Sequence, residues 1–162
     1  MAVILWGKPL ITISNLTGAA ITSNALTVPT PVINTTQLST ERGEKHEAQI
    51  EGGGNEAVRY DRGNHTLEFE VRFAKDRVMP LQDQCEDGII KGSYKITVED
   101  PVDTTAPKMA MEDAVGSYED ILNAEDGARR HYYFDSQVPT GGGSQITWSN
   151  IGEVSSNSGS VQ

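Results

Sequence analysis

Two glutamates separated by one residue are the strongest candidates for chemistry in this sequence. Glu68 and Glu70 lie in the run 65–73, where polar and apolar residues alternate, so both carboxylates point to one face of a strand. Carboxylate pairs of this kind perform acid/base catalysis in glycoside hydrolases. However, Arg72 shares that face as a salt-bridge partner, and the aromatic residues that would contact a sugar make up only 6% of the chain. The pair therefore favours a polar surface over a catalytic site.

The other reactive side chains form no catalytic arrangement. Cys85 lies between Asp83 and Glu86, whose charges raise rather than lower the pKa of a thiol, so we expect a small core residue rather than a nucleophile. The spacing of Asp83, Glu86 and Asp87 does not match a calcium-binding loop. The histidines are dispersed among polar residues: His46, His65 and His131. We therefore predict no catalytic, cofactor or metal site, and no enzyme activity.

The three glycines at 52–54 could suggest a phosphate-binding loop. No Lys-Ser/Thr pair or helix follows them, and Glu56 adds negative charge where a phosphate would lie. Their sequence context favours a bulge or the flexible tip of a hairpin.

The balance of charge argues against a nucleic-acid reader. The chain has 13 Lys and Arg against 23 Asp and Glu, which gives a formal charge of −10 and a surface that repels phosphate. No stretch approaches the roughly 20 apolar residues that cross a bilayer, and the apolar run 2–6 lacks the basic segment of a signal peptide. A single cysteine, Cys85, fits a reducing compartment. We expect a protein made and soluble in a cytoplasm.

The pattern along the chain is mainly β. A length of 162 residues fits one domain, so we predict a single β domain over 1–151 and a flexible tail over 152–162. In the run 65–73, Leu67, Phe69, Val71 and Phe73 should face the core. The run 57–60 should form a hairpin with it through the turn 61–64. Further strands are expected at 2–6, 10–14, 46–51, 92–99, 128–137 and 145–151, where Ile146 and Trp148 should face the core.

Two segments with apolar residues are less regular. Residues 74–87 predict a short helix or a turn near Pro80, and residues 108–121 fit either a strand broken near Gly116 or a short helix. We prefer two long strands joined at Asp126-Gly127, a common hairpin pair. The result is a β-sandwich or partly closed barrel of about eight strands with at most one short helix.

Residues 15–45 are rich in Thr, Ser, Asn and Pro and carry little charge before Glu41. Pro29 and Pro31 favour an extended backbone. A segment of this length without clear elements is long for a loop in a compact domain. It is expected either as an ordered arm that contacts a partner or as a floppy loop.

Four segments of the chain resemble tail tube proteins of long-tailed phages, such as those that infect Bacteroidetes. They are Trp6-Gly7-Lys8-Pro9, the run 36–45, the run 50–56 and the run 88–94. The resemblance covers residues 1 to about 151 and rests on the order and character of these segments. It implies a β-sandwich with one short helix at 78–87.

The resemblance also implies a function. Subunits of that family form hexameric rings whose inner sheets join into a continuous barrel, and their arms lock successive rings into a tube for DNA ejection. The protein would then belong to the virion tail, contact copies of itself and other tail proteins, and let genome DNA pass without specific binding. Arg59 and Arg72 depart from a purely acidic lining. Lumen-facing candidates are Glu47, Glu51, Glu68 and Glu70, and arm candidates are Pro29, Pro31, Thr36, Gln37 and Leu38.

Two other classes of protein remain alternatives. A monomeric binding module, such as a carbohydrate-binding or capsid decoration sandwich, fits the same pattern of strands. So does another tail or injection-system tube component, because fold alone does not assign function.

Overall fold

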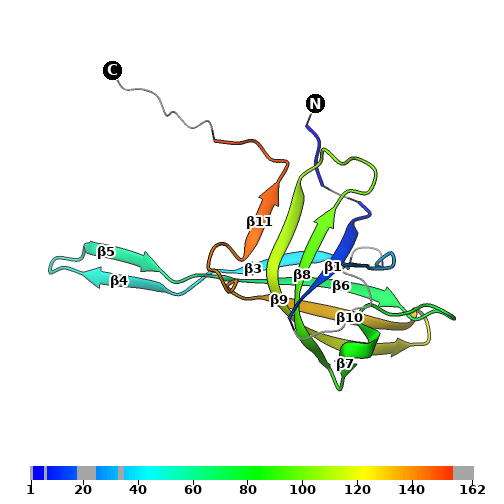
Figure 1. The fold of residues 1–162 in the computed structure, drawn as a ribbon. Coiled ribbons are helices and arrows are strands. Elements are labelled where there is room, and N and C mark those ends of the chain that lie inside the picture. The colour runs from blue at the N-terminus through cyan, green and yellow to red at the C-terminus, as the bar shows by residue number, and fades with distance from the viewer. Residues whose placement is uncertain (1, 6, 18–24, 33–34, 155–162) are drawn as a thin grey trace.

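The protein is built from antiparallel strands (Figure 1). The computed structural model describes residues 2–5, 7–17, 25–32 and 35–154. Eight of the strands in this part have five residues or more, and the one helical element is a single 3-10 turn, η1 (Gln82–Gln84). The strands are β1 (Leu10–Thr17), β2 (Ala25–Thr27), β3 (Gln37–Glu41), β4 (Lys45–Gln49), β5 (Asn55–Tyr60), β6 (Asn64–Arg72), β7 (Cys85–Glu86), β8 (Ile89–Glu99), β9 (Lys108–Asn123), β10 (Gly127–Ser136) and β11 (Ile146–Ser149).

The body is a sandwich-like arrangement in which the long strand β9 belongs to both layers. Its first part pairs with β8 and β11, and its last part pairs with β10. The upper layer in Figure 1 contains β2, β1, β8, the start of β9 and β11, and the lower layer contains the end of β9, β10, β6 and β3. The mainly β prediction is confirmed.

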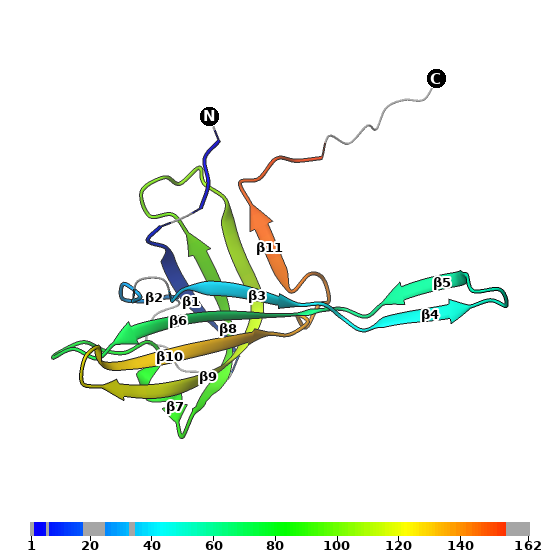
Figure 2. The same cartoon turned by 180° about the vertical axis from the view of Figure 1, so that it is seen from behind.

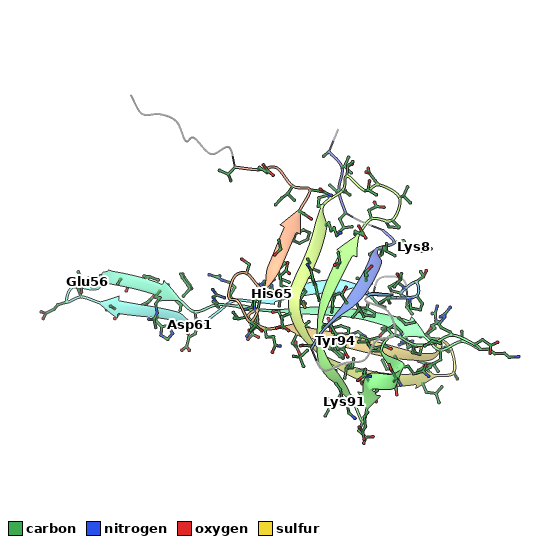
Figure 3. All side chains as sticks on the ribbon, in the orientation of Figure 1. Lys8, Glu56, Asp61, His65, Lys91 and Tyr94 are labelled. Atoms are coloured by element: carbon green, nitrogen blue, oxygen red, sulfur yellow. The ribbon has the colours of Figure 1, made fainter. Side chains whose placement is uncertain are left out.

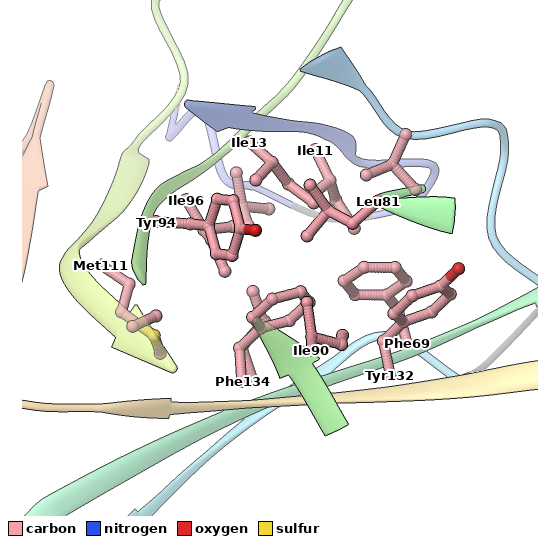
Figure 4. Close-up of a cluster of buried hydrophobic side chains, with 14 of the residues drawn as sticks. Ile11, Ile13, Phe69, Leu81, Ile90, Tyr94, Ile96, Met111, Tyr132 and Phe134 are labelled. Carbon is pink, nitrogen blue, oxygen red and sulfur yellow. The ribbon is translucent and has the colours of Figure 1, made fainter. Parts of the chain in front are cut away.

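The core lies between these layers and is centred on aromatic side chains (Figure 4). Phe69 of β6 stacks on Tyr132 and Phe134 of β10, with ring centroids 5.1 and 5.8 Å apart. Ile11 and Ile13 of β1 close the core from the other side. Alternation along each strand places these side chains on one face, as predicted for β6.

Phe73 does not join this core. Its side chain is 42% exposed because β6 ends at Arg72 and the chain turns away. The Arg130 guanidinium lies 5.2 Å from the Phe73 ring centroid. The prediction of a buried Phe73 is therefore wrong, whereas Leu67, Phe69 and Val71 are buried as expected.

The strand β9 is continuous through Gly116, so neither the predicted break nor the helix occurs. A Cβ atom on this glycine would lie 2.8 Å from Cε1 of Phe134. The glycine therefore makes room for a core ring across the strand. The hairpin at Asp126-Gly127 is confirmed: Gly127 adopts a φ of 80° and pairs with Asn123.

Several local predictions are corrected or refined. Residues 2–5 form no strand, and the helix expected near Pro80 is reduced to the turn η1. Ile146 packs against the core, but Trp148 beside it is 45% exposed. The strand β5 pairs with β4 rather than with β6. Most of the predicted tail 152–162 lies outside the described residues.

Two buried tyrosines make the stability of the fold sensitive to alkali. Burial raises the pKa of Tyr94 to about 12, and it also raises the pKa of Tyr132, whose hydroxyl donates to the Pro80 carbonyl at 2.9 Å. A raised pKa stabilises the fold fully below the unfolded-state value near 10, and this contribution is lost as pH rises through the folded-state value. We expect the free energy of unfolding to fall between pH 10 and 12, measured by urea titration. Tyr94→Phe should flatten this fall, and an equal slope in the variant would contradict the assignment.

Candidate functional site

A two-stranded arm projects from the body and is the most unusual feature of the molecule. It consists of β4 and β5 with the intervening turn, and both views of the fold show it extending away from the sandwich (Figures 1 and 2). Every residue of β4 and β5 is exposed. These include Val58 and Tyr60, which are 46% and 53% exposed. An isolated hairpin is marginally stable in water, so an arm of this kind gains stability when a partner covers it.

The root of the arm is packed backbone against backbone. The two connections, residues 42–44 and 61–63, run side by side, and the Asp61 amide donates to the Glu44 carbonyl at 2.9 Å. A Cβ on Gly43 would lie 1.9 Å from the Asp61 carbonyl oxygen, and one on Gly63 would lie 2.4 Å from the Glu41 carbonyl oxygen. Glycine at both positions is therefore required by the close approach of the two chains.

Three side chains that could ligate a metal meet at this root. Glu44, His46 and Asp61 each offer one atom, and these atoms lie within 4.8 Å of one another. The His46 and Asp61 side chains are 43% and 49% exposed, and His46 Nε2 is 2.9 Å from Asp61 Oδ2. Arg59 is the cross-strand partner of His46 and brings a cation to the same face. The bond between His46 and Asp61 joins the arm to its root.

The second notable surface is the outer face of the lower layer. Along β3, β6, β10 and the end of β9, alternate residues point away from the core, as the register of the four strands requires. The face carries more acids than bases. By this alternation, its acids are Glu41, Glu68, Glu70, Glu119 and Asp135, and its bases are Arg72, Arg129 and His131.

An ion-pair cluster occupies the middle of this face. Glu70 lies 3.0 Å from Arg129 Nε and 2.9 Å from His131 Nδ1, and His131 Nε2 is 3.4 Å from Glu68. Gln37 of β3 donates to the Glu68 carboxylate. The Glu70, Arg129 and His131 side chains are only 12 to 18% exposed. Arg129 Nε and His131 Nε2 are buried and lie near the carboxylates of Glu70 and Glu68, but neither atom makes a hydrogen bond.

Arg72 is not the partner of the two glutamates, contrary to expectation. Its Nε donates to the Asp126 carbonyl at 3.3 Å, across the end of the sheet. The partners come instead from β10, where Arg129 and His131 lie directly opposite Arg72 and Glu70 of β6. In the sequence Arg129, Arg130 and His131 are consecutive, so neither their alternation nor the pairing of β6 with β10 is visible there.

Removing the charge of Glu70 should destabilise the fold. In Glu70→Gln, Arg129 loses its close carboxylate while largely buried, and loss of one partner of such a pair costs on the order of 1–3 kcal/mol. Urea unfolding measures the change. Glu125→Gln, at the exposed β9–β10 turn, is the matched control and should change stability by less than about 0.5 kcal/mol. Equal effects of the two substitutions would contradict this account of the cluster.

The predicted site residues fall into separate groups. Glu68 and Glu70 share the outer face of β6, whereas Glu47 lies on β4, 2.5 Å from Lys45, and Glu51 lies at the tip of the arm. The glycines 52–54 form that tip, as expected. The structure therefore does not bring the four glutamates into one surface.

The described part of the segment 15–45 lies along the body. Val28 is buried and its amide donates to the Ile11 carbonyl, and the Val32 amide donates to the backbone carbonyl of Glu70 in β6. Residues 18–24 and 33–34 of this segment are outside the described residues. Val28 in the core and Leu38 packed against it hold this described part to the body. The arm candidates lie in β3 or in the connection from β2 to β3: Pro29, Pro31, Thr36, Gln37 and Leu38.

The histidines and Cys85 form no common site in the described part of the chain. His65 accepts or donates a bond with Thr40 at 2.9 Å, and Cys85 packs against the core. Burial is the main cause that raises the pKa of the Cys85 thiol, so Asp83 contributes less than the sequence suggested.

Comparison with known proteins adds no family. No family model matches the chain, and no curated protein matches it significantly. In the described part of the chain, no helix is long and apolar enough to span a membrane. The features of the molecule that bear on function are the arm and the outer face of the lower layer.

Proposed function

We propose that this protein is a structural subunit that assembles with copies of itself into rings and then into a tube, as in a phage tail. The observation that carries the proposal is the arm, Lys45–Gln49 and Asn55–Tyr60 with their turn, which is exposed along its whole length. An exposed hairpin costs a monomer stability and solubility, but it offers a subunit a contact with its neighbour.

Open sheet edges support the same proposal. In the described residues β3 pairs with β6 alone, so its other edge is free, and the opposite end of the lower layer is the last part of β9. Pairing of these edges between neighbours would extend the layer into a closed wall, which removes both edges at once.

The outer face of the lower layer would line the lumen. Its five acids exceed its two arginines and one histidine, and a polyanion slides best along a wall that does not bind it with counter-charges. Glu68 and Glu70 keep the lumen role, Arg129 balances part of their charge, and His131 bonds to Glu70. Glu47 and Glu51 belong to the arm instead. Other tail proteins are then partners at the ends of the tube, and the virion tail is the location.

Removal of the arm tests the proposal. The protein and a variant in which a short Gly-Ser turn replaces residues 45–60 are compared by light scattering and electron microscopy over a wide range of concentration. We expect rings or tubes for the full chain and monomers for the variant. The body of the variant should unfold at the same temperature, because no arm residue belongs to the core. If the full chain stays monomeric at all concentrations, the proposal is overturned and a monomeric binding module is favoured.

A further inference from the structure

A groove of about 580 Å³ opens beside the root of the arm. It lies between the start of β6 with its neighbour β3 and the strand β11, where the two layers of the sandwich diverge. Leu38, Ile146 and Trp148 form its apolar side. Leu38 and Ile146 continue inward to the core, whereas Trp148 is 45% exposed. A groove of this size accommodates several side chains of a partner.

The polar side of the groove is basic in a protein that is otherwise acidic. Its ionisable residues are Arg62 and His65, and no carboxylate lines it, although the chain has a formal charge of −10. Arg62 Nη1 donates to the Gly143 carbonyl at 3.1 Å, which holds the guanidinium across the groove. An acidic segment with an apolar side chain would complement this lining.

The tip of the arm has that chemistry. Residues 49–58 contain Glu51 and Glu56 and no lysine or arginine, and both glutamates are exposed. Neither carboxylate has an ion-pair partner among the described residues. Ile50, beside them, is 51% exposed. The three glycines between the two glutamates add no side chains to the tip.

We infer that the groove receives the tip of the arm of a second copy of this chain. The tip cannot reach the groove of its own molecule, because Glu56 lies at the far end of the arm while His65 lies near its root (Figure 3). Ile50 then packs on Trp148, and the glutamates approach Arg62. Each copy offers one tip and one groove, so the contact repeats head to tail and closes a ring or continues as a row. The inference rests on the proposed function and specifies its contact.

Charge reversal tests the pairing. Arg62→Glu and the double variant Glu51→Arg/Glu56→Arg are each expected to raise the concentration at which half of the protein assembles by at least about tenfold, because like charges then meet. A mixture of the two variants restores opposite charges in half of the possible contacts and should recover part of the assembly. Lys75→Glu matches the change of charge of Arg62→Glu, and Glu125→Arg/Glu153→Arg matches that of the double variant. Both controls lie at exposed sites elsewhere and should assemble like the parent.

Cross-linking gives an independent readout. In a Cys85→Ser background, Gly53→Cys in one sample and Ser144→Cys in another are mixed under mild oxidation, and the disulfide dimer is measured on gels. We expect this pair to cross-link at least about tenfold faster than Gly53→Cys mixed with Val102→Cys, which is 91% exposed at a different site. Equal rates would overturn the inference.

The outcomes separate the two proposals. Normal tubes from Arg62→Glu, without preferred cross-linking at Ser144, would overturn the groove contact and leave the tube proposal intact. A parent protein that stays monomeric would overturn both.

Discussion

Replacing Gly43 by alanine is expected to prevent assembly while the body stays folded. A Cβ at this position would lie 1.9 Å from the carbonyl oxygen and 2.4 Å from the carbonyl carbon of Asp61, and both are backbone atoms that no rotamer change can move. The two connections at the root must therefore separate, which redirects the arm. The core contains no residue of the root, so the cost in unfolding free energy should stay within about 1–3 kcal/mol.

The measurement for Gly43→Ala is the assembled fraction by sedimentation, together with the unfolding transition of the body. Gly152→Ala is the matched control, because its added Cβ meets no atom within 4 Å. This control should assemble as the parent does. Tubes of normal yield from Gly43→Ala would show that the direction of the arm does not matter for assembly.

Replacing Phe69 by alanine is expected to give the largest loss of stability. Phe69 is fully buried and stacks on both Tyr132 and Phe134. Truncation of a core phenylalanine costs about 3–5 kcal/mol, through lost burial and the cavity that remains. Because the total stability of a domain is about 5–15 kcal/mol, the variant should be close to unfolding at ambient temperature.

Phe73→Ala is the informative control for Phe69→Ala. The two residues have the same parity in the alternating run, so a complete strand would bury both, but Phe73 is 42% exposed beyond the end of β6. Its loss should cost about 1 kcal/mol, including the contact with Arg130. Urea unfolding of both variants distinguishes the two environments. Equal losses would mean that β6 continues and that Phe73 is part of the core.

The strands with a buried face were predictable from the sequence because burial of one face leaves a two-residue period. Phe69 and Val71 in β6 and Tyr132 and Phe134 in β10 show this. The partners of a strand are not encoded in that period. The sequence therefore indicated the orientation of Glu68 and Glu70 but not their neighbours, Arg129 and His131.

The position of the projecting arm at residues 45–60 was not apparent from the sequence, for a physical reason. Residues 15–45 have the composition of a loop, yet a few apolar side chains such as Val28 and Leu38 are enough to hold their described part to the body. Residues 45–60 alternate weakly and look like ordinary strands, but their apolar side chains find no cover. Local pattern predicts strands, whereas tertiary contact decides whether a strand pairs within the body or leaves it.

A cryo-electron microscopy map of the protein at high concentration tests the central claim most directly. The account predicts a hollow tube of stacked rings, with the face that carries Glu68 and Glu70 toward the lumen and the arm, Lys45–Gln49 and Asn55–Tyr60 with their turn, against a neighbouring subunit. A protein that remains monomeric under all conditions would contradict it. So would a tube in which Glu68 and Glu70 face the outside or the arm touches no other subunit.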